Sequence, residues 1–464
     1  MEQSTLDDGS PGHGRLPLKR RWWAWSTWFT TTQLENPRFL VRLWLIARIT
    51  VFAIWLTLAP STQGDVVYYY DKINALFTLG PRQTLIEYPT PVIGLLLIPY
   101  YLGFTTTVGY IIVFVLVMVA LDAAFARSLW VNGGRLRGVA VLFWVVFLGF
   151  IGPTAYLRFD LVTSTLAGWA LLSLVKKNHT RAGALIGLGA ATKLWPALLW
   201  PALLRGDTKS RVKTTLAMFG LGGVLALASL LWAGWDRLLS PLTWQSGRHL
   251  QVESVWATPA MLWRIVRRHD YWVGISSFQA FEIWGPGANA LLSLASISSY
   301  VGYALTVVVY LAWLRPGRTR RRIEGVVLML MVILVMIVTN KTFSPQYIIW
   351  VGGPLAAGLS VLSASDDQSE ERRLQDERRL IRTGSVLLGL TLLTQLVYPI
   401  GYAPLVKGSL GMTAVTVVLA LRNLGIVLLL VWVLQWLWSF LRPGGNETPG
   451  TTDPETAIRG ETQS

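Results

Sequence analysis

Residues 105–127 read TTTVGYIIVFVLVMVALDAAFAR, an apolar run that ends in a basic residue. An α-helix rises about 1.5 Å per residue, so about 20 such residues cross the roughly 30 Å hydrocarbon core of a bilayer. Similar runs recur along the chain, and short clusters of Lys and Arg separate them. This pattern predicts an all-α polytopic membrane protein.

The composition supports the same class. Of 464 residues, 53% are hydrophobic and 14% are charged, whereas a soluble domain has about 25% charged residues. The net charge is +16, but because the cations cluster between apolar runs they indicate cytoplasmic loops, and we expect no nucleic-acid partner. The absence of cysteine excludes disulfides, thiolate metal sites and a Cys nucleophile.

We expect about twelve transmembrane helices, of which the fifth and sixth are too short to cross alone. They could instead form one helix, 182–204, kinked at Pro196. We favour two short helices that meet at residues 192–196, since Lys193 in the middle of a lipid-exposed span would cost several kcal/mol. The twelve segments are 41–60, 105–127, 138–152, 160–175, 182–192, 195–204, 214–234, 287–314, 324–340, 345–363, 384–403 and 410–440.

The basic loops orient this arrangement. They all fall on the cytoplasmic side if both termini are cytoplasmic and segment 91–103 lies along the outer face instead of crossing. Two long extracellular loops follow, 61–104 and 235–286, each carrying an interfacial helix.

The domain boundaries follow from the composition of the two ends. We predict a cytoplasmic segment over 1–38 with an interfacial Trp/Arg helix and no cleavable signal peptide. The transmembrane domain spans 39–442, and the cytoplasmic tail 443–464 is rich in Gly, Pro, Thr and Glu and is expected to be disordered.

The first outer loop carries the best candidate for an acid or base. Asp65 follows the first span, in the stretch GDVVYYYD (64–71), and a second stretch, EYPTP (87–91), comes shortly after. A carboxylate at this position can act as a general base on a hydroxyl. The alternative is a helix cap or a solvated aspartate.

Several cations at the outer face run against the general charge bias. They suit a phosphate or diphosphate ligand, although Arg158 could simply pair with Asp160, and Lys193 could reach the interface with its long side chain. These cations are Arg158, Lys193, Lys341 and Arg248.

Polar side chains in the second outer loop suit hydrogen bonding to a sugar. Residues 248–253 combine a cation, a histidine, an amide and a carboxylate, which is a weak set of metal ligands. A Gln-Tyr pair follows the ninth span on the same side, whereas Arg422-Asn423 in the last span is expected to be buried against its neighbours. No nucleotide-binding motif is present in the sequence. The substrate-binding candidates are Tyr68, Asp71, Tyr88, Asp160, Arg248, His249, Gln251, Glu253, Gln346 and Tyr347.

Taken together, these stretches resemble the GT-C superfamily of membrane glycosyltransferases, and most closely glycosyltransferase family 87. The resemblance is spread over residues 40–440 and rests on the order and placement of short motifs. They are Asp65 with Tyr68, YPTP (88–91), RFD (158–160), ATKLWP (191–196), residues 248–254, SPQY (344–347) and Arg422-Asn423.

The resemblance implies a GT-C-like helical bundle that transfers a sugar from a polyprenyl-phosphate donor with inversion at the anomeric carbon. It implies that Asp65 is the catalytic base and that Arg158, Lys193 and Lys341 bind the donor phosphate. Mannose is the sugar it favours, although Gln346-Tyr347 stand where the family's mannosyltransferases tend to have paired histidines.

The implied partners are the lipid-linked donor, a glycolipid or polysaccharide acceptor of the cell envelope, and the bilayer. The active site would lie on the extracytoplasmic face of the cell membrane. We expect no cofactor and no metal, since nothing in the sequence supports a divalent ion.

Two other functions remain open from the sequence. The same charged residues could line the pathway of a transporter or lipid-linked-sugar flippase, although no internal repeat is visible and the candidates gather at one face. The chain could also be a structural or assembly subunit whose outer residues bind a partner.

Overall fold

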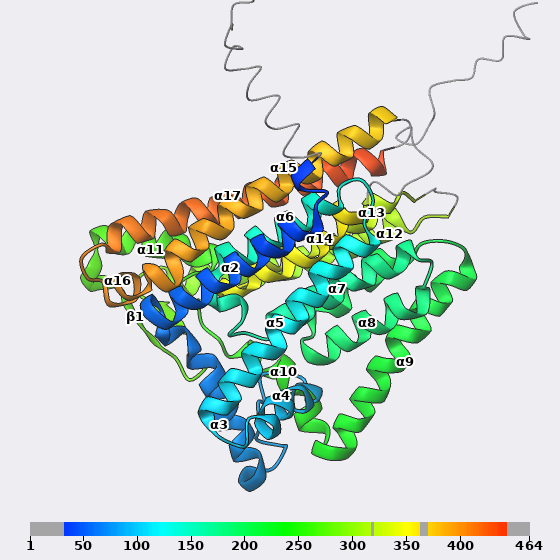
Figure 1. The fold of residues 1–464 in the computed structure, drawn as a ribbon. Helices are drawn as coiled ribbons and strands as arrows, with labels where there is room; N and C mark the ends of the chain where they lie inside the picture. The colour runs from blue at the N-terminus through cyan, green and yellow to red at the C-terminus, as the bar shows by residue number, and fades with distance from the viewer. Residues whose placement is uncertain (1–31, 317–319, 362–369, 443–464) are drawn as a thin grey trace, which may run out of the picture.

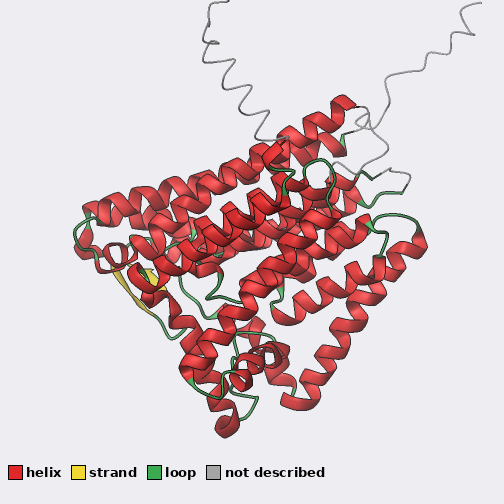
Figure 2. Cartoon of the chain, in the orientation of Figure 1, coloured by secondary structure: helices red, strands yellow, loops and turns green. Residues whose placement is uncertain are grey.

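The computed structural model describes residues 32–316, 320–361 and 370–442. These residues form a bundle of helices with one small β-hairpin (Figure 2). Eight segments of the described chain are long and apolar enough to cross a membrane, so the chain is a polytopic membrane protein. Their helices are α2 (Pro37–Leu58), α5 (Thr107–Asn132), α6 (Arg137–Ile151), α9 (Thr208–Ala233), α12 (Ala288–Trp313), α13 (Arg322–Thr339), α15 (Glu370–Gln395) and α17 (Met412–Leu441).

Shorter elements connect the long helices. The short α-helices are α3 (Gly64–Leu79), α4 (Pro91–Leu102), α7 (Asp160–Val175), α8 (His179–Thr192), α10 (Trp235–Ser246), α11 (Thr258–Val266), α14 (Ile349–Val361) and α16 (Tyr402–Lys407). The 3-10 helices are η2 (Pro60–Gln63), η3 (Gly152–Ala155), η4 (Trp195–Leu203), η5 (Val255–Ala257), η6 (Arg268–Asp270) and η7 (Pro345–Ile348). A π-helix, η9 (Leu396–Ile400), follows α15, and strands β1 (Trp272–Ile275) and β2 (Phe281–Trp284) pair antiparallel.

Within the described residues, each of the twelve predicted segments is mainly helical, with shifted ends. Four of them are shorter than the eight candidate spans, and segment 195–204 is a 3-10 helix, not an α-helix. Residues 370–382, a charged stretch between the tenth and eleventh predicted segments, are helical as the first part of α15. The predicted interfacial helix at residues 20–25 and the tail 443–464 lie outside the described residues.

The break between the two short helices at Lys193 is confirmed. Helix α8 ends at Thr192, Lys193 adopts an extended backbone conformation, and η4 begins at Trp195 with Pro196 in its first turn. Proline has no backbone N–H, so Pro196 could not donate to the carbonyl of Thr192 if α8 continued as one α-helix. The helix therefore ends before the proline, and Lys193 lies at the break.

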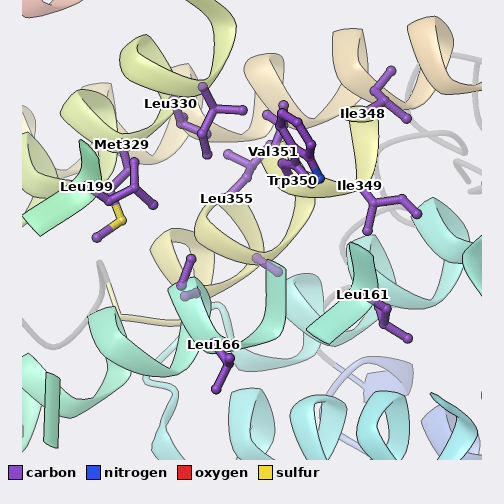
Figure 3. Packing of buried hydrophobic residues seen from close by; sticks show 14 of the residues in the cluster. Leu161, Leu166, Leu199, Met329, Leu330, Ile348, Ile349, Trp350, Val351 and Leu355 are labelled. Atoms are coloured by element: carbon purple, nitrogen blue, oxygen red, sulfur yellow. The ribbon is translucent and has the colours of Figure 1, made fainter. Parts of the chain in front are cut away.

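Helix α14 packs closely against α7 in the middle of the bundle. Figure 3 shows the apolar side chains here, including Leu161 and Leu166 of α7 and Trp350 and Leu355 of α14. A Cβ atom at Gly353 would overlap the carbonyl oxygen of Ser164, so only glycine permits this approach. The Ser164 hydroxyl also donates to the Ile349 carbonyl and accepts from the Gly353 amide. This contact fixes Trp350 relative to the start of α7.

A buried ion pair joins the first long helices. Asp122 of α5 pairs with Arg48 of α2 at 2.8 Å, and it accepts hydrogen bonds from Trp44, Trp144 and Tyr156. Both charged groups are almost completely buried, so each relies on the other and on these donors. The network anchors the Tyr156 end of the segment that leads into α7.

The short elements of the two long loops gather toward one end of the bundle. In Figure 1, the start of α2 and the end of α17 lie at the other end, and α3, α4, α11 and β1 lie away from it. Segment 91–103 is a short helix as predicted, and the second outer loop also carries a short amphipathic helix, α11.

Candidate functional site

The candidate base forms an ion pair with one of the candidate phosphate ligands. Asp65 lies in the first turn of α3, and its Oδ2 is 2.5 Å from the Nε of Arg158, which precedes α7. The Asp65 side chain keeps 40% of its surface accessible, whereas Arg158 keeps only 8%. Asp65 is therefore a carboxylate that a substrate can reach, held by a cation that is nearly buried.

The surroundings of Asp65 favour its protonated form. Burial among protein atoms raises its pKa above the usual value, and neighbouring Asp160 raises it further. Arg158 and Lys193 act in the opposite direction and lower the pKa. A carboxyl group with a raised pKa is a better proton acceptor once it is ionised.

A second ion pair lies beside the first. The Nζ of Lys193 is 2.6 Å from the Oδ1 of Asp160, and the same oxygen accepts a hydrogen bond from the Trp350 indole at 2.5 Å. The alternative pairing of Arg158 with Asp160 does not occur, because Asp65 binds Arg158 and Lys193 binds Asp160. The alternative for Lys193 was a side chain that extends away from the protein, but only 15% of this side chain is exposed.

Aromatic rings surround the Lys193 ammonium group. A cation near the face of an aromatic ring is attracted by the electron density of the ring, and several rings together hold its position. Tyr347 also stacks on Trp350, with 4.1 Å between ring centroids. The rings within 5.3–5.8 Å of Nζ belong to Tyr88, Phe159, Tyr347 and Trp350.

The loop that carries Tyr88 is held from the second outer loop. Arg237 of α10 is 2% exposed and donates hydrogen bonds to the carbonyl oxygens of Thr84, Leu85 and Tyr88. Its helix also supplies the Ser240 hydroxyl, which donates to the carbonyl of Ile86. An arginine can bind several carbonyls at once because its donors form a rigid fork. Arg237 therefore fixes the backbone next to the ring that faces Lys193.

A hydrogen bond within the first outer loop also holds the segment that carries Tyr88. The Tyr68 hydroxyl donates to the Glu87 carboxylate at 2.8 Å, and burial together with that carboxylate raises the pKa of Tyr68 far above its usual value. Tyr68 therefore remains a neutral donor at any physiological pH. Asp71, further along α3, is exposed.

The second-loop candidates form a separate group with Lys341. Burial and the charge of Arg248 lower the pKa of Lys341, whereas Glu282 acts to raise it. The His249 backbone N–H donates to Glu282, and the His249 ring lies 3.1 Å from the side-chain oxygen of Asn289. The charges that act on Lys341 are thus those of Arg248 and Glu282, whereas those that act on Asp65 are Arg158, Asp160 and Lys193.

Gln251 and Glu253 are bonded within the protein. Gln251 accepts from the Phe343 amide and donates to Ser344, just before η7, which carries Gln346 and Tyr347. Glu253 pairs with Arg422 at 3.2 Å, and both side chains are fully buried. The expectation that Arg422 and Asn423 are buried against their neighbours is confirmed, because Asn423 donates to the carbonyls of Glu253 and Ser254.

Three residues of the site escaped the sequence analysis. Trp350 binds Asp160, Arg237 holds the Tyr88 loop, and Tyr398 of η9 lies against the Arg158 guanidinium. Each stands in an apolar run or in an amphipathic segment, where an aromatic ring or a single cation carries no specific signal.

A comparison with models of protein families shows to which family the chain belongs. The model of glycosyltransferase family 87 matches residues 87–345, which is more than half of the chain. The chain belongs to glycosyltransferase family 87. No curated protein and no solved structure matches it in the corresponding searches.

The matched region of this family 87 protein contains only part of the candidate site. Arg158, Lys193 and Lys341 fall within residues 87–345, whereas Asp65 precedes that region and Tyr347 follows it. The structure brings Asp65 to Arg158 and Tyr347 to Lys193. The chain is therefore a membrane glycosyltransferase whose candidate site is completed by residues outside the matched region.

Proposed function

We propose that this family 87 glycosyltransferase transfers a sugar, preferably mannose, from a polyprenyl-phosphate donor to an envelope glycolipid or polysaccharide. The site faces the extracytoplasmic side, and both termini are cytoplasmic. The observation that carries the proposal is the accessible Asp65 carboxylate in an ion pair with Arg158, next to the Asp160–Lys193 pair.

In the proposed reaction, Asp65 accepts the proton of the acceptor hydroxyl as its oxygen attacks C1 of the donor sugar. The new C1–O bond forms as the bond from C1 to the phosphate oxygen breaks, with inversion at C1. The leaving group departs as polyprenyl phosphate, and Asp65 holds the proton until solvent removes it.

The two ion pairs suit the movement of charge in this reaction. The four groups of Asp65, Arg158, Asp160 and Lys193 sum to zero charge when all are ionised, so the donor phosphodiester adds the only net charge. When Asp65 takes the proton, Arg158 loses its partner just as the leaving phosphate gains negative charge. A cation already in position stabilises that charge without rearranging the site.

Lys193 serves the same leaving phosphate from the other side. Asp160, Trp350 and the surrounding rings hold its ammonium group in one place. Lys341 lies in the group with Arg248 and Glu282, so we assign it to the periphery of the donor site. We propose no cofactor and no metal for this reaction.

The test is sugar transfer by the purified chain in nanodiscs. Radiolabelled polyprenyl-phosphate mannose and then the arabinose analogue are supplied with an envelope glycolipid extract as acceptor. We expect label to move from the mannose donor to the acceptor and polyprenyl phosphate to be released. In sealed proteoliposomes, movement of intact donor across the bilayer without transfer would instead identify a flippase and would refute the proposal.

A further inference from the structure

The β-hairpin of the second outer loop has two different faces. Because side chains alternate along a strand, cross-strand pairs share a face. Val273, Ile283 and Phe281 lie on the face that packs into an apolar cluster with Leu405 and Leu419. The opposite face carries two cross-strand pairs, Trp272 with Trp284 and Gly274 with Glu282.

Three rings lie against one another on this second face. The indoles of Trp272 and Trp284 are 4.3 Å apart between centroids and tilted by 36°, and the His249 ring stacks on Trp284 at 5.3 Å with an interplanar angle of 24°. Trp272 forms the outer end of the stack and is 60% exposed. A Cβ atom at Gly274 would overlap its indole, so glycine lets this ring lie flat across the strand.

Polar groups border the stack. The buried Glu282 carboxylate accepts from the His249 amide, and Asn289 lies beside the His249 ring. Arg248 Nε and His249 Nδ1 are among the buried side-chain atoms of the described residues that have no hydrogen-bond partner. The protein therefore leaves hydrogen-bonding capacity unused in these two side chains next to the stack.

We propose that this aromatic platform, formed by Trp272, Trp284 and His249 with Glu282 and Arg248 at its edge, binds the sugar rings of the acceptor. A pyranose or furanose ring has an apolar C–H face that packs on the exposed ring of Trp272, and hydroxyls at its rim that can bond to imidazole and guanidinium groups, whereas the buried Glu282 holds the His249 backbone in place. A tryptophan that only anchors the protein in lipid would not require polar side chains beside its ring. This assignment rests on the proposed function.

The platform connects directly to the candidate catalytic site. Gln251, two residues after His249, bonds to Phe343 and Ser344. The next turn, η7, carries Tyr347, whose ring lies 5.4 Å from the Lys193 ammonium group. The loop that carries His249 is therefore bonded to the segment that supplies Tyr347 to the candidate catalytic site.

Transfer kinetics of the full chain in nanodiscs test the platform. We expect Trp272→Ala to raise the acceptor KM about tenfold, with kcat and the donor KM nearly unchanged. Trp272→Phe keeps a ring and should restore most of the affinity, whereas Gly274→Ala displaces the indole and should raise the acceptor KM as well. Trp235→Ala is the control, since Trp235 on α10 is equally exposed.

Binding of free saccharides separates this inference from the proposed function. Saturation-transfer NMR with mannotriose and an arabinan trisaccharide should show ring contacts to the native chain that are lost in Trp272→Ala. If transfer fails but a trisaccharide binds in this way, the proposed function falls and the platform stands. If neither trisaccharide binds the native chain, or if Trp235→Ala and Trp272→Ala have equal effects, the platform is refuted and Trp272 is a membrane anchor.

Discussion

Replacing Arg158 by Gln should move the acidic limb of the pH–rate profile to higher pH. Asp65 must be ionised to act as a base, and Arg158, at 2.5 Å, favours the ionised form. An opposite charge within about 4–6 Å lowers a carboxyl pKa by about 1–3. Because 40% of the Asp65 side chain is accessible, solvent screening places the effect on the pKa at the low end, about 1.

The sign of this change follows from the charges. Loss of the cation leaves burial and Asp160 to raise the Asp65 pKa unopposed by Arg158. The variant therefore loses its base at a higher pH, and a pKa higher by about 1 lowers kcat/KM on the acidic limb about tenfold. The maximum of the profile should fall too, since Arg158 is also a proposed phosphate ligand.

The assay is kcat/KM for transfer, measured across pH in nanodiscs for the native chain, Arg158→Gln and Arg158→Lys. This quantity reports ionisations of the free enzyme, and the donor phosphodiester does not titrate in the working range. Arg158→Lys keeps the charge and should leave the limb near its native position. The reasoning is refuted if the limb of Arg158→Gln coincides with that of the native chain.

Three further predictions address the other contacts. Lys193→Met should lower kcat about 10²–10³-fold, whereas Lys72→Met, which removes a cation near the Tyr68 ring, should change kcat little; equal effects would exclude a specific role for Lys193. Arg237→Gln should lower kcat at least tenfold through misplacement of the Tyr88 loop, and Arg237→Lys should recover part of the loss. The control Arg82→Gln changes an exposed arginine of the same loop and should leave kcat unchanged. Glu253→Gln and Arg422→Met should each lower the free energy of unfolding in detergent by about 3–5 kcal/mol, because each leaves one buried charge without its partner. The double variant removes both charges and should lose less stability than either single variant. Additive losses in the double variant would show that the two residues do not act as a pair.

Much of the helical arrangement could be predicted from apolar runs and basic loops. The break at Lys193 was predictable as well, because a lysine and a proline stand together inside an apolar stretch. Composition alone does not separate a spanning helix from a short helix packed among others, since both are apolar. Segments 182–192 and 195–204 illustrate this, because they are apolar but shorter than the eight candidate spans of the described chain.

The residues of the candidate site were easier to predict than their pairings. Sequence proximity suggested Arg158 with Asp160, but Asp160 begins α7 and bonds to Lys193 and Trp350 instead. Pairing of this kind depends on tertiary contacts between distant segments. Arg237 could not be found at all, since its acceptors are backbone carbonyls, which leave no mark in the sequence.

The most direct test of Asp65 as the catalytic base is single-turnover transfer by Asp65→Asn. The control variant is Asp71→Asn, which makes the same change on the same helix. The amide keeps the shape of the side chain but cannot accept the acceptor's proton. We predict that Asp65→Asn loses transfer by about 10²–10⁴-fold while donor binding stays within a few-fold, and that Asp71→Asn still transfers. Transfer by Asp65→Asn at a rate close to that of the native chain would contradict the assignment of Asp65 as the base.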